Sequence, residues 1–295
     1  MKNTPLVITL LGAAAVFLPL HGVSAQDLYV ANGNGNTISK ITTNGTVSTF
    51  ATGISQPTFL AFDSAGNLFT ASAVSDDIYK ITPDGTVSTF ATGVIAPEGL
   101  AFDASGNLFV GSSSTISKIT TNGTVSTFAS GFGAVYGLAF NSAEDLFASD
   151  LTSGQIKKIT TNGTVSTFAS GLNYPYGVAF NSSSNLFAAN YIIGNSVSEI
   201  TTNGIVSTFA SGLTAPSGMA FNSSGLLFVS SGYTNDTIYE IATNGSVSTF
   251  VTSELLNGPT GLAFGPTSVP EPSTYALLGL GAIGMLIAFR RKKTA

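Results

Sequence analysis

Short β-type runs separated by turn residues follow one another through the middle of the chain. In one stretch the runs are Gly99 to Phe102, Leu108 to Val110, Thr115 to Thr120 and Thr124 to Ala129. Asp-Ala-Ser-Gly-Asn joins the first two, and Thr-Asn-Gly, whose Asn-Gly pair favours a tight hairpin, joins the last two. No segment shows the period of about 3.6 residues that marks an amphipathic helix. The pattern therefore predicts units of four antiparallel strands.

This four-strand unit recurs six times. The marker Gly-x-Val-Ser-Thr-Phe repeats at steps of 40, 38, 40, 41 and 41 residues and starts at Gly45, Gly85, Gly123, Gly163, Gly204 and Gly245. Two other markers, Leu-Phe or Leu-Tyr and Ala-Phe, have six copies each. Four antiparallel strands in about 40 residues describe one blade of a β-propeller.

The order of the markers at the two ends predicts a closed ring. The repeats begin at a second strand, Leu28 to Val30, and finish with a first strand, Gly261 to Phe264. The two fragments complete one blade, whose inner strand comes from the C-terminal side and whose other three come from the N-terminal side, so no sheet edge stays open. We therefore predict an all-β fold, a six-bladed propeller over residues 26–266.

The first 25 residues have the pattern of a secretory signal peptide. Lys2 precedes an apolar run from Leu6 to Leu20, and Val-Ser-Ala follows, which suits cleavage after Ala25. The alternative is an uncleaved anchor. The chain has no cysteine, so we expect packed apolar surface, and no disulfide framework, to stabilise the exported protein.

Residues 267–295 carry a second targeting pattern. Pro270, Glu271 and Pro272 precede an apolar stretch from Tyr275 to Phe289 and a basic cluster at residues 290–293. The stretch is short for a permanent membrane span, and the basic cluster would stay on the cytoplasmic side. This order resembles the PEP-CTERM sorting domain. The resemblance implies an exosortase as processing partner, transient insertion into the inner membrane and delivery to the cell surface or extracellular matrix; the alternative is a simple membrane anchor.

Charge excludes one class of partner. Of the 10 basic residues, five lie in the terminal segments: Lys2, Arg290, Arg291, Lys292 and Lys293. The remaining acidic body cannot neutralise a run of phosphates, so we expect no nucleic-acid partner.

The blade motif, as in residues 97–103 and 106–110, resembles NHL-type repeats and the superfamily of gluconolactonases, strictosidine synthases and streptogramin lyases. The resemblance spans residues 27–266 and implies a propeller fold. It does not choose a function, because one propeller fold hosts enzymes, receptors and scaffolds.

Ligand sites in such propellers are expected at the channel rim, where inner strands begin and second strands end. In the six repeats the residues at the start of the inner strand are Thr58, Glu98, Tyr136, Tyr176, Ser217 and Thr260. Those that end the second strand are Asn32, Ser72, Ser112, Asp150, Asn190 and Ser231. From these positions we select six candidate binding residues: Glu98, Tyr136, Tyr176, Asp150, Asn32 and Asn190.

The candidate residues argue against catalysis. Gluconolactonase-like relatives hold a divalent metal with Glu, Asn and Asp, and here Glu98 alone matches the Glu-Gly pattern; a hard cation wants about six oxygen ligands. Streptogramin-lyase-like relatives use a histidine base with a metal, and the one histidine, His21, lies in the predicted signal peptide. We predict no catalytic residues and no cofactor, with a divalent cation at Glu98 as the alternative.

Tyr136 and Tyr176, with Tyr174 nearby, give the remaining functional signal. Aromatic faces beside hydroxyl and amide groups suit a sugar ring or an extended peptide. The sequence thus favours an exported, non-catalytic propeller that binds or scaffolds at the cell surface, with an exopolysaccharide or peptide as ligand. The alternative is a metal-dependent lactonase-like or lyase-like enzyme built around Glu98, and a further one is that the tyrosines only plug the channel.

Overall fold

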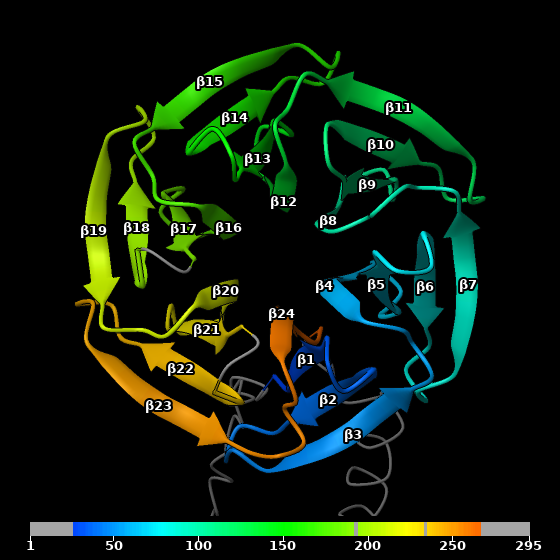
Figure 1. Ribbon diagram of the computed structural model, residues 1–295, viewed down its shortest axis with the longest axis vertical. Coiled ribbons are helices and arrows are strands. Elements are labelled where there is room, and N and C mark those ends of the chain that lie inside the picture. Colours follow the sequence, from blue (N-terminus) through cyan, green and yellow to red (C-terminus); the bar gives the residue numbers. More distant parts are fainter. Residues whose placement is uncertain (1–25, 192–193, 233–234, 267–295) are drawn as a thin grey trace, which may run out of the picture.

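A computed structural model describes residues 26–191, 194–232 and 235–266. In this part of the chain, 24 strands form six four-stranded antiparallel sheets arranged as blades around a central axis, which we call the channel (Figure 1). The fold class predicted from the sequence is confirmed, including the way in which the ring closes. None of the described elements is a helix long and apolar enough to span a membrane.

The blades are numbered I to VI around the ring, and each is given from its inner to its outer strand. Blade I comprises β24 (Pro259–Phe264), β1 (Leu28–Asn32), β2 (Thr37–Ile41) and β3 (Val47–Thr52). Blade II comprises β4 (Pro57–Phe62), β5 (Leu68–Ser72), β6 (Asp77–Ile81) and β7 (Val87–Thr92). Blade III comprises β8 (Leu100–Phe102), β9 (Leu108–Gly111), β10 (Thr115–Ile119) and β11 (Val125–Ser130).

The other three blades follow the same order. Blade IV comprises β12 (Val135–Phe140), β13 (Leu146–Asp150), β14 (Gln155–Ile159) and β15 (Val165–Ser170). Blade V comprises β16 (Pro175–Phe180), β17 (Leu186–Asn190), β18 (Ser196–Ile200) and β19 (Val206–Ser211). Blade VI comprises β20 (Pro216–Phe221), β21 (Leu227–Ser231), β22 (Thr237–Ile241) and β23 (Val247–Thr252).

The ring is closed in blade I, where chain segments from the two ends pair. Strand β24 pairs antiparallel with β1, with Leu28 opposite Phe264 and Val30 opposite Leu262. Beyond the strand, the backbone N–H of Gly265 donates to the carbonyl of Asp27 at 2.9 Å. Every inner strand thereby has a neighbouring strand on its outer side, which leaves no open edge at the junction.

The hydrophobic core lies between the blades. Apolar side chains on alternate strand positions face the two neighbouring sheets and form six separate clusters. Each cluster contains an aromatic trio in which a central ring meets two others edge to face, as Phe109 meets Phe128 at 4.8 Å and Phe140 at 5.1 Å. A single blade cannot bury these faces alone, so the stability of each blade depends on its neighbours.

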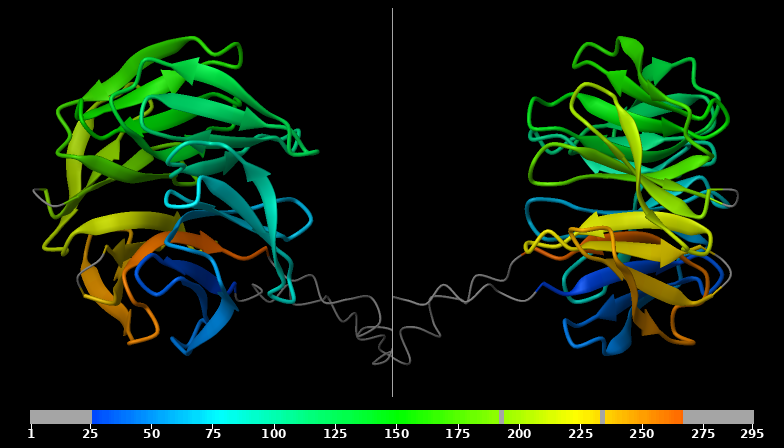
Figure 2. Two further views of the ribbon diagram at one scale, coloured as in Figure 1. Left: turned by 45° about the vertical axis from the view of Figure 1, so that its right-hand side comes forward. Right: turned by 90° about the vertical axis from the view of Figure 1, so that its left-hand side faces the viewer.

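The ring has two different ends. At the end that we call the mouth face, inner strands begin and second strands finish; at the other end, the base face, inner strands finish and second strands begin. Gln26 and Gly265, where the described chain starts and finishes the ring, meet at the base face through a hydrogen bond from Gln26 Nε2 to the Gly265 carbonyl. Figure 2 shows the blue and orange ends of the ring lying together on that side. The mouth face is therefore turned away from the point where residues 267–295 begin.

Candidate functional site

Hydrogen bonds from hydroxyl side chains link neighbouring inner strands around half of the channel. Ser217 donates to the carbonyl of Thr260 at 3.3 Å, Thr260 to that of Thr58 at 3.1 Å, and Thr58 to that of Glu98 at 3.0 Å. These residues occupy the same repeat position in blades VI, I and II. In blades III, IV and V that position holds Glu98, Tyr136 and Tyr176, so the chemistry of the mouth differs between the two halves of the ring.

The inner strands approach closely because five of them carry glycine at the next position. A Cβ atom added to Gly99 would lie 1.9 Å from the carbonyl oxygen of Tyr136 in the next blade, and one added to Gly218 would lie 2.1 Å from that of Thr260. Blade II has Phe59 there. Because this position faces blade III, strand β4 of blade II cannot approach β8 of blade III as closely as the other inner strands approach one another. Strand β8 spans three residues, whereas the other inner strands span six.

Phe59 and three tyrosines form an aromatic cluster at the mouth. The Phe59 ring stacks on Tyr176 with centroids 5.6 Å apart, although blades II and V lie on opposite sides of the channel (Figure 1). Tyr176 also contacts Tyr136 at 4.4 Å and Tyr191 at 5.1 Å. The phenyl ring thus bridges the channel, and Tyr136 and Tyr191, each partly exposed, form the outer surface of the cluster.

The carboxyl group of Glu98 lies beside this cluster. Its Oε2 atom is shut off from solvent and has no hydrogen-bond partner among the described residues. Burial raises the pKa of Glu98 to about 8. The pKa of Tyr136 is also raised, first by burial and then by the charges of Glu98 and Tyr191. At neutral pH the side chain of Glu98 is accordingly a neutral acid that can donate a hydrogen bond.

The other three predicted site residues, Asn32, Asp150 and Asn190, form hydrogen bonds within hairpins and loops. The Asn32 amide donates to Thr37 Oγ1 at 3.0 Å and Ser39 Oγ at 2.8 Å, and Asn190 makes the equivalent pair of bonds to Ser196 and Ser198. Asp150 accepts from the backbone N–H groups of the loop that enters blade IV. The structure therefore brings Glu98, Tyr136 and Tyr176 together and places Asn32, Asp150 and Asn190 in hairpin and loop networks.

Replacing Asp150 with asparagine is expected to destabilise the ring by about 1–2 kcal/mol at pH 7, because one buried carboxylate accepts from both Gly133 N and Ala134 N. Burial acts to raise the pKa of Asp150, but these N–H donors outweigh it and lower the pKa. The stability that Asp150 contributes is thus present above its ordinary pKa and lost as the pH falls through the lowered value. Denaturant unfolding at pH 7 and in acid measures both effects. Asp145→Asn, which loses only a surface ion pair to Lys158, is the control; equal losses in the two variants would contradict the assignment.

Two members of the cluster were missed by sequence reasoning. Phe59 can be detected in the sequence, because it stands where the other five repeats have glycine. The sequence does not, however, predict the direction in which its phenyl group points. Tyr191 follows Asn190 in a turn, and only the folded ring brings it to Tyr176.

The residues around Glu98 do not fit a hard divalent cation. Such an ion needs several oxygen ligands, whereas the ionisable group that interacts with Glu98 is the phenol of Tyr136, and the carboxyl of Glu98 favours the neutral form. The carboxylate of Asp150 in blade IV, another predicted site residue, accepts hydrogen bonds from loop amides. In the described ranges no three His, Cys, Asp or Glu side chains come together as a metal site would require.

Comparison with known proteins places this geometry in a family. The virginiamycin B lyase family matches residues 16–232, and the PEP-CTERM protein-sorting motif matches residues 268–292. The first match covers well over half of the chain, and the chain belongs to the virginiamycin B lyase family. The second indicates export and sorting to the cell surface by an exosortase, with transient passage through the membrane. The predicted signal peptide and cleavage after Ala25, and Pro270, Glu271 and Pro272, lie outside the described residues.

Solved structures share the fold at low sequence identity. A streptogramin B lyase superposes with a TM-score of 0.64 and 17% identity over 81% of this chain and 92% of the other. A catalytically inactive variant of virginiamycin B lyase from Staphylococcus aureus, solved with quinupristin, gives 0.63 and 17% over 83% and 94%. A nidogen/laminin complex gives 0.73 and 16% over 82% and 99%. No relative was found among curated proteins.

Proposed function

We propose that the protein is a non-catalytic propeller of the cell surface or extracellular matrix that binds a hydroxyl-rich ligand, such as a matrix polysaccharide, at its mouth face. The observation that carries this proposal is the aromatic cluster with Glu98. It lies at an inner-strand position where the six repeats differ, with Thr or Ser in three blades and Glu98, Tyr136 and Tyr176 in the other three.

The chemistry of the cluster suits a neutral sugar. Tyr136 and Tyr191 offer aromatic faces and hydroxyl groups, and a neutral Glu98 adds both a donor and an acceptor. Loops around the mouth also expose large apolar side chains, among them Ile95 at 75% and Val74 at 61%.

The position of the mouth supports the same proposal. The described chain begins and ends the ring at the base face, so attachment through residues 267–295 would direct the mouth outward. The propeller, residues 26–266, would have to supply any catalytic residues, and it contains no histidine and no cysteine. These are the side chains best suited to proton transfer and nucleophilic attack near neutral pH.

Binding to soluble polysaccharides tests the proposal. The full chain is expected to be retarded in affinity electrophoresis through gels containing dextran, β-glucan or galactan, with at least one polymer giving saturable binding. Tyr136→Ala is expected to weaken that binding by up to about tenfold, because one aromatic contact is worth roughly 0.5–1.5 kcal/mol. Ile205→Ala is the control, since Ile205 is an exposed apolar side chain in a loop at the base face; equal effects of the two substitutions would contradict the assignment.

A second function, lyase catalysis, is favoured by family membership and by the raised pKa of Glu98, which would suit a general acid or base near neutral pH. Incubation with quinupristin, followed by mass spectrometry for a linear product, distinguishes the two. We expect no turnover above that of heat-inactivated protein. Turnover that disappears in Glu98→Gln would replace the binding proposal with the enzymatic one.

A further inference from the structure

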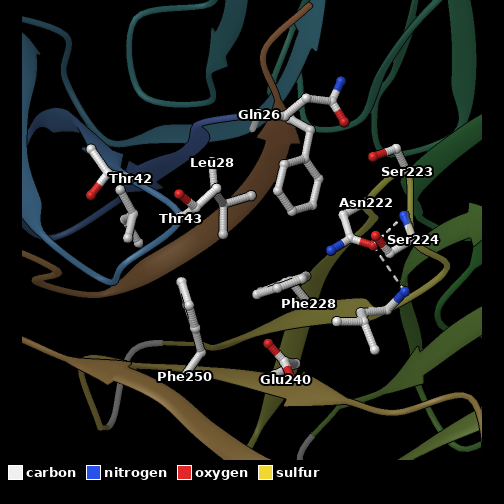
Figure 3. A pocket seen from close by; sticks show the side chains of 13 residues that line it. Gln26, Leu28, Thr42, Thr43, Asn222, Ser223, Ser224, Phe228, Glu240 and Phe250 are labelled. Carbon is white, nitrogen blue, oxygen red and sulfur yellow. Dashed lines mark hydrogen bonds between the residues drawn. The ribbon is translucent and has the colours of Figure 1, made fainter. Parts of the chain in front are cut away.

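A second candidate site lies at the base face, in the groove between blades VI and I. This groove encloses a cavity of about 310 Å³. Its floor is the aromatic trio of Phe228, Phe250 and Phe264, in which the two outer rings lie 5.0 and 5.2 Å from Phe228. Glu240 stands beside Phe228 on the neighbouring strand, and Figure 3 shows the two side chains next to each other in the groove.

In four other blades of the propeller, the position of Glu240 is occupied by a different residue type. In blades I to IV a lysine takes the position of Glu240, and its ammonium lies over the central aromatic ring. The distances from Nζ to the ring centroid are 5.9 Å for Lys40, 5.8 Å for Lys80, 5.3 Å for Lys118 and 6.0 Å for Lys158. Cations within about 6 Å of an aromatic centroid are attracted to the ring face.

A carboxylate completes three of these lysine sites. Lys40 pairs with Asp27 at 2.7 Å, Lys118 with Asp103 at 3.8 Å and Lys158 with Asp145 at 2.8 Å. The protein thus repeatedly places an ammonium between an aromatic ring and a carboxylate. The alkyl arm of each lysine reaches this point from its own strand.

In the groove between blades VI and I, the aromatic ring of Phe228 remains, the positions of the carboxylates that pair with the lysines hold Asn222 and Leu226, and a carboxylate stands at the lysine position itself. Glu240 replaces the lysine, and no hydrogen bond or ion pair within the described ranges reaches its carboxylate. Leu226 stands where blade V has Asn185. Around the cavity, the side chains of Gln26, Thr42 and Ser223 offer further oxygen acceptors.

In blade V the equivalent carboxylate already has a hydrogen-bond partner. Blade V also has a glutamate at the lysine position, Glu199, but Asn185 Nδ2 donates to its Oε1 at 2.7 Å. The carboxylate of Glu199 is therefore engaged within its own blade. This difference provides a matched control for Glu240.

We propose that the groove between blades VI and I binds a primary alkylammonium group supplied by another molecule. The ammonium would lie over Phe228 and pair with Glu240, in the place that the lysine ammonium takes in blades I to IV. Its alkyl arm would contact Leu28 and Phe264, which line the cavity. A lysine side chain of a partner and a free aliphatic amine share this chemistry.

Ligands that differ only in the ammonium test this site. The full chain is titrated by calorimetry and NMR with Nα-acetyl-lysine methylamide, with n-butylammonium, and with Nα-acetyl-norleucine methylamide, which lacks the charge. Saturable 1:1 binding of the lysine compound, at least about tenfold tighter than the norleucine compound, is expected from a charge-assisted contact. Binding of n-butylammonium as well would show that the ammonium suffices, whereas preference for the lysine compound alone would identify a peptide source; either supports the site.

Variants locate the binding. Glu240→Gln is expected to weaken the lysine compound about tenfold, and Glu240→Lys to abolish its binding, because the chain then fills the site as it does in blades I to IV. Glu199→Gln is expected to leave binding unchanged, and thermal unfolding of all three variants confirms the fold. No saturable binding by either ammonium, equal binding of the norleucine compound, or equal losses in the Glu240 and Glu199 variants would overturn the proposal.

Discussion

Replacing Glu98 with glutamine is expected to raise the free energy of unfolding above pH 8 and to flatten its dependence on pH. Burial raises the pKa of Glu98 to about 8 in the folded protein, against an ordinary value of 4.5. Below pH 4.5 the carboxyl is protonated in both states and costs nothing. Between pH 4.5 and about 8 the unfolded chain releases the proton and the folded chain retains it, so stability falls as the pH rises.

The slope of this decline is at most about 1.4 kcal/mol per pH unit, and the total is on the order of a few kcal/mol. Above pH 8 both states are ionised, and the penalty no longer grows. Glutamine has nearly the same shape and no charge, so Glu98→Gln should lose the decline. Denaturant unfolding of the full chain at intervals from pH 4.5 to 9.5 measures it.

The control for this experiment is Glu254→Gln, which removes an exposed carboxylate from a turn. Asp150 does not interfere, since its pKa is lowered and it titrates in acid. If wild type and Glu98→Gln give parallel profiles between pH 5 and 8.5, the carboxyl is solvated and the description of the mouth is wrong. The result also bears on the binding proposal, because a neutral Glu98 is one of its hydrogen-bond donors.

Among glycine-to-alanine substitutions outside the aromatic cluster, Gly218→Ala is expected to lower the free energy of unfolding the most. The added Cβ would lie 2.1 Å from the Thr260 carbonyl oxygen and 2.9 Å from the Cα atom of Gly261, both of which are backbone atoms of the next blade. Relief requires blades VI and I to separate at the channel. We expect a loss of about 3 kcal/mol, at the upper end for overpacked cores, measured by denaturant unfolding.

Gly53→Ala separates this effect from ordinary strain. Gly53 has a φ of 82° and open space around it, so alanine there meets no neighbouring atom and pays only the cost of left-handed backbone, about 1 kcal/mol. A Gly218→Ala protein as stable as the Gly53→Ala protein would mean that the inner strands can move apart freely. The hydroxyl bonds from Ser217 and Ser230 to Thr260 argue that they cannot.

The sequence by itself determined the fold of residues 26–266. Turn residues such as Asn122-Gly123 and the alternation of apolar positions are local signals, and six copies at a period near 40 residues leave few ways to bury them. Ring closure was also predictable, because strand fragments at the two ends complement each other. Glu98, Tyr136 and Tyr176 could be selected in the same way, as departures from a repeat at one position.

Tertiary structure decided which candidates act together. Asn32, Asp150 and Asn190 have residue types that suit a site, but the amide N–H groups of Asn32 and Asn190 donate to hydroxyls of the adjoining hairpin, and Asp150 accepts from loop N–H groups. Phe59 reaches Tyr176 because the ring brings opposite blades within one side chain of each other. The free carboxylate of Glu240 likewise depends on which neighbour faces it. Sequence periodicity specifies the face of a strand, whereas the partner of a side chain depends on distances across blades that only the closed ring sets.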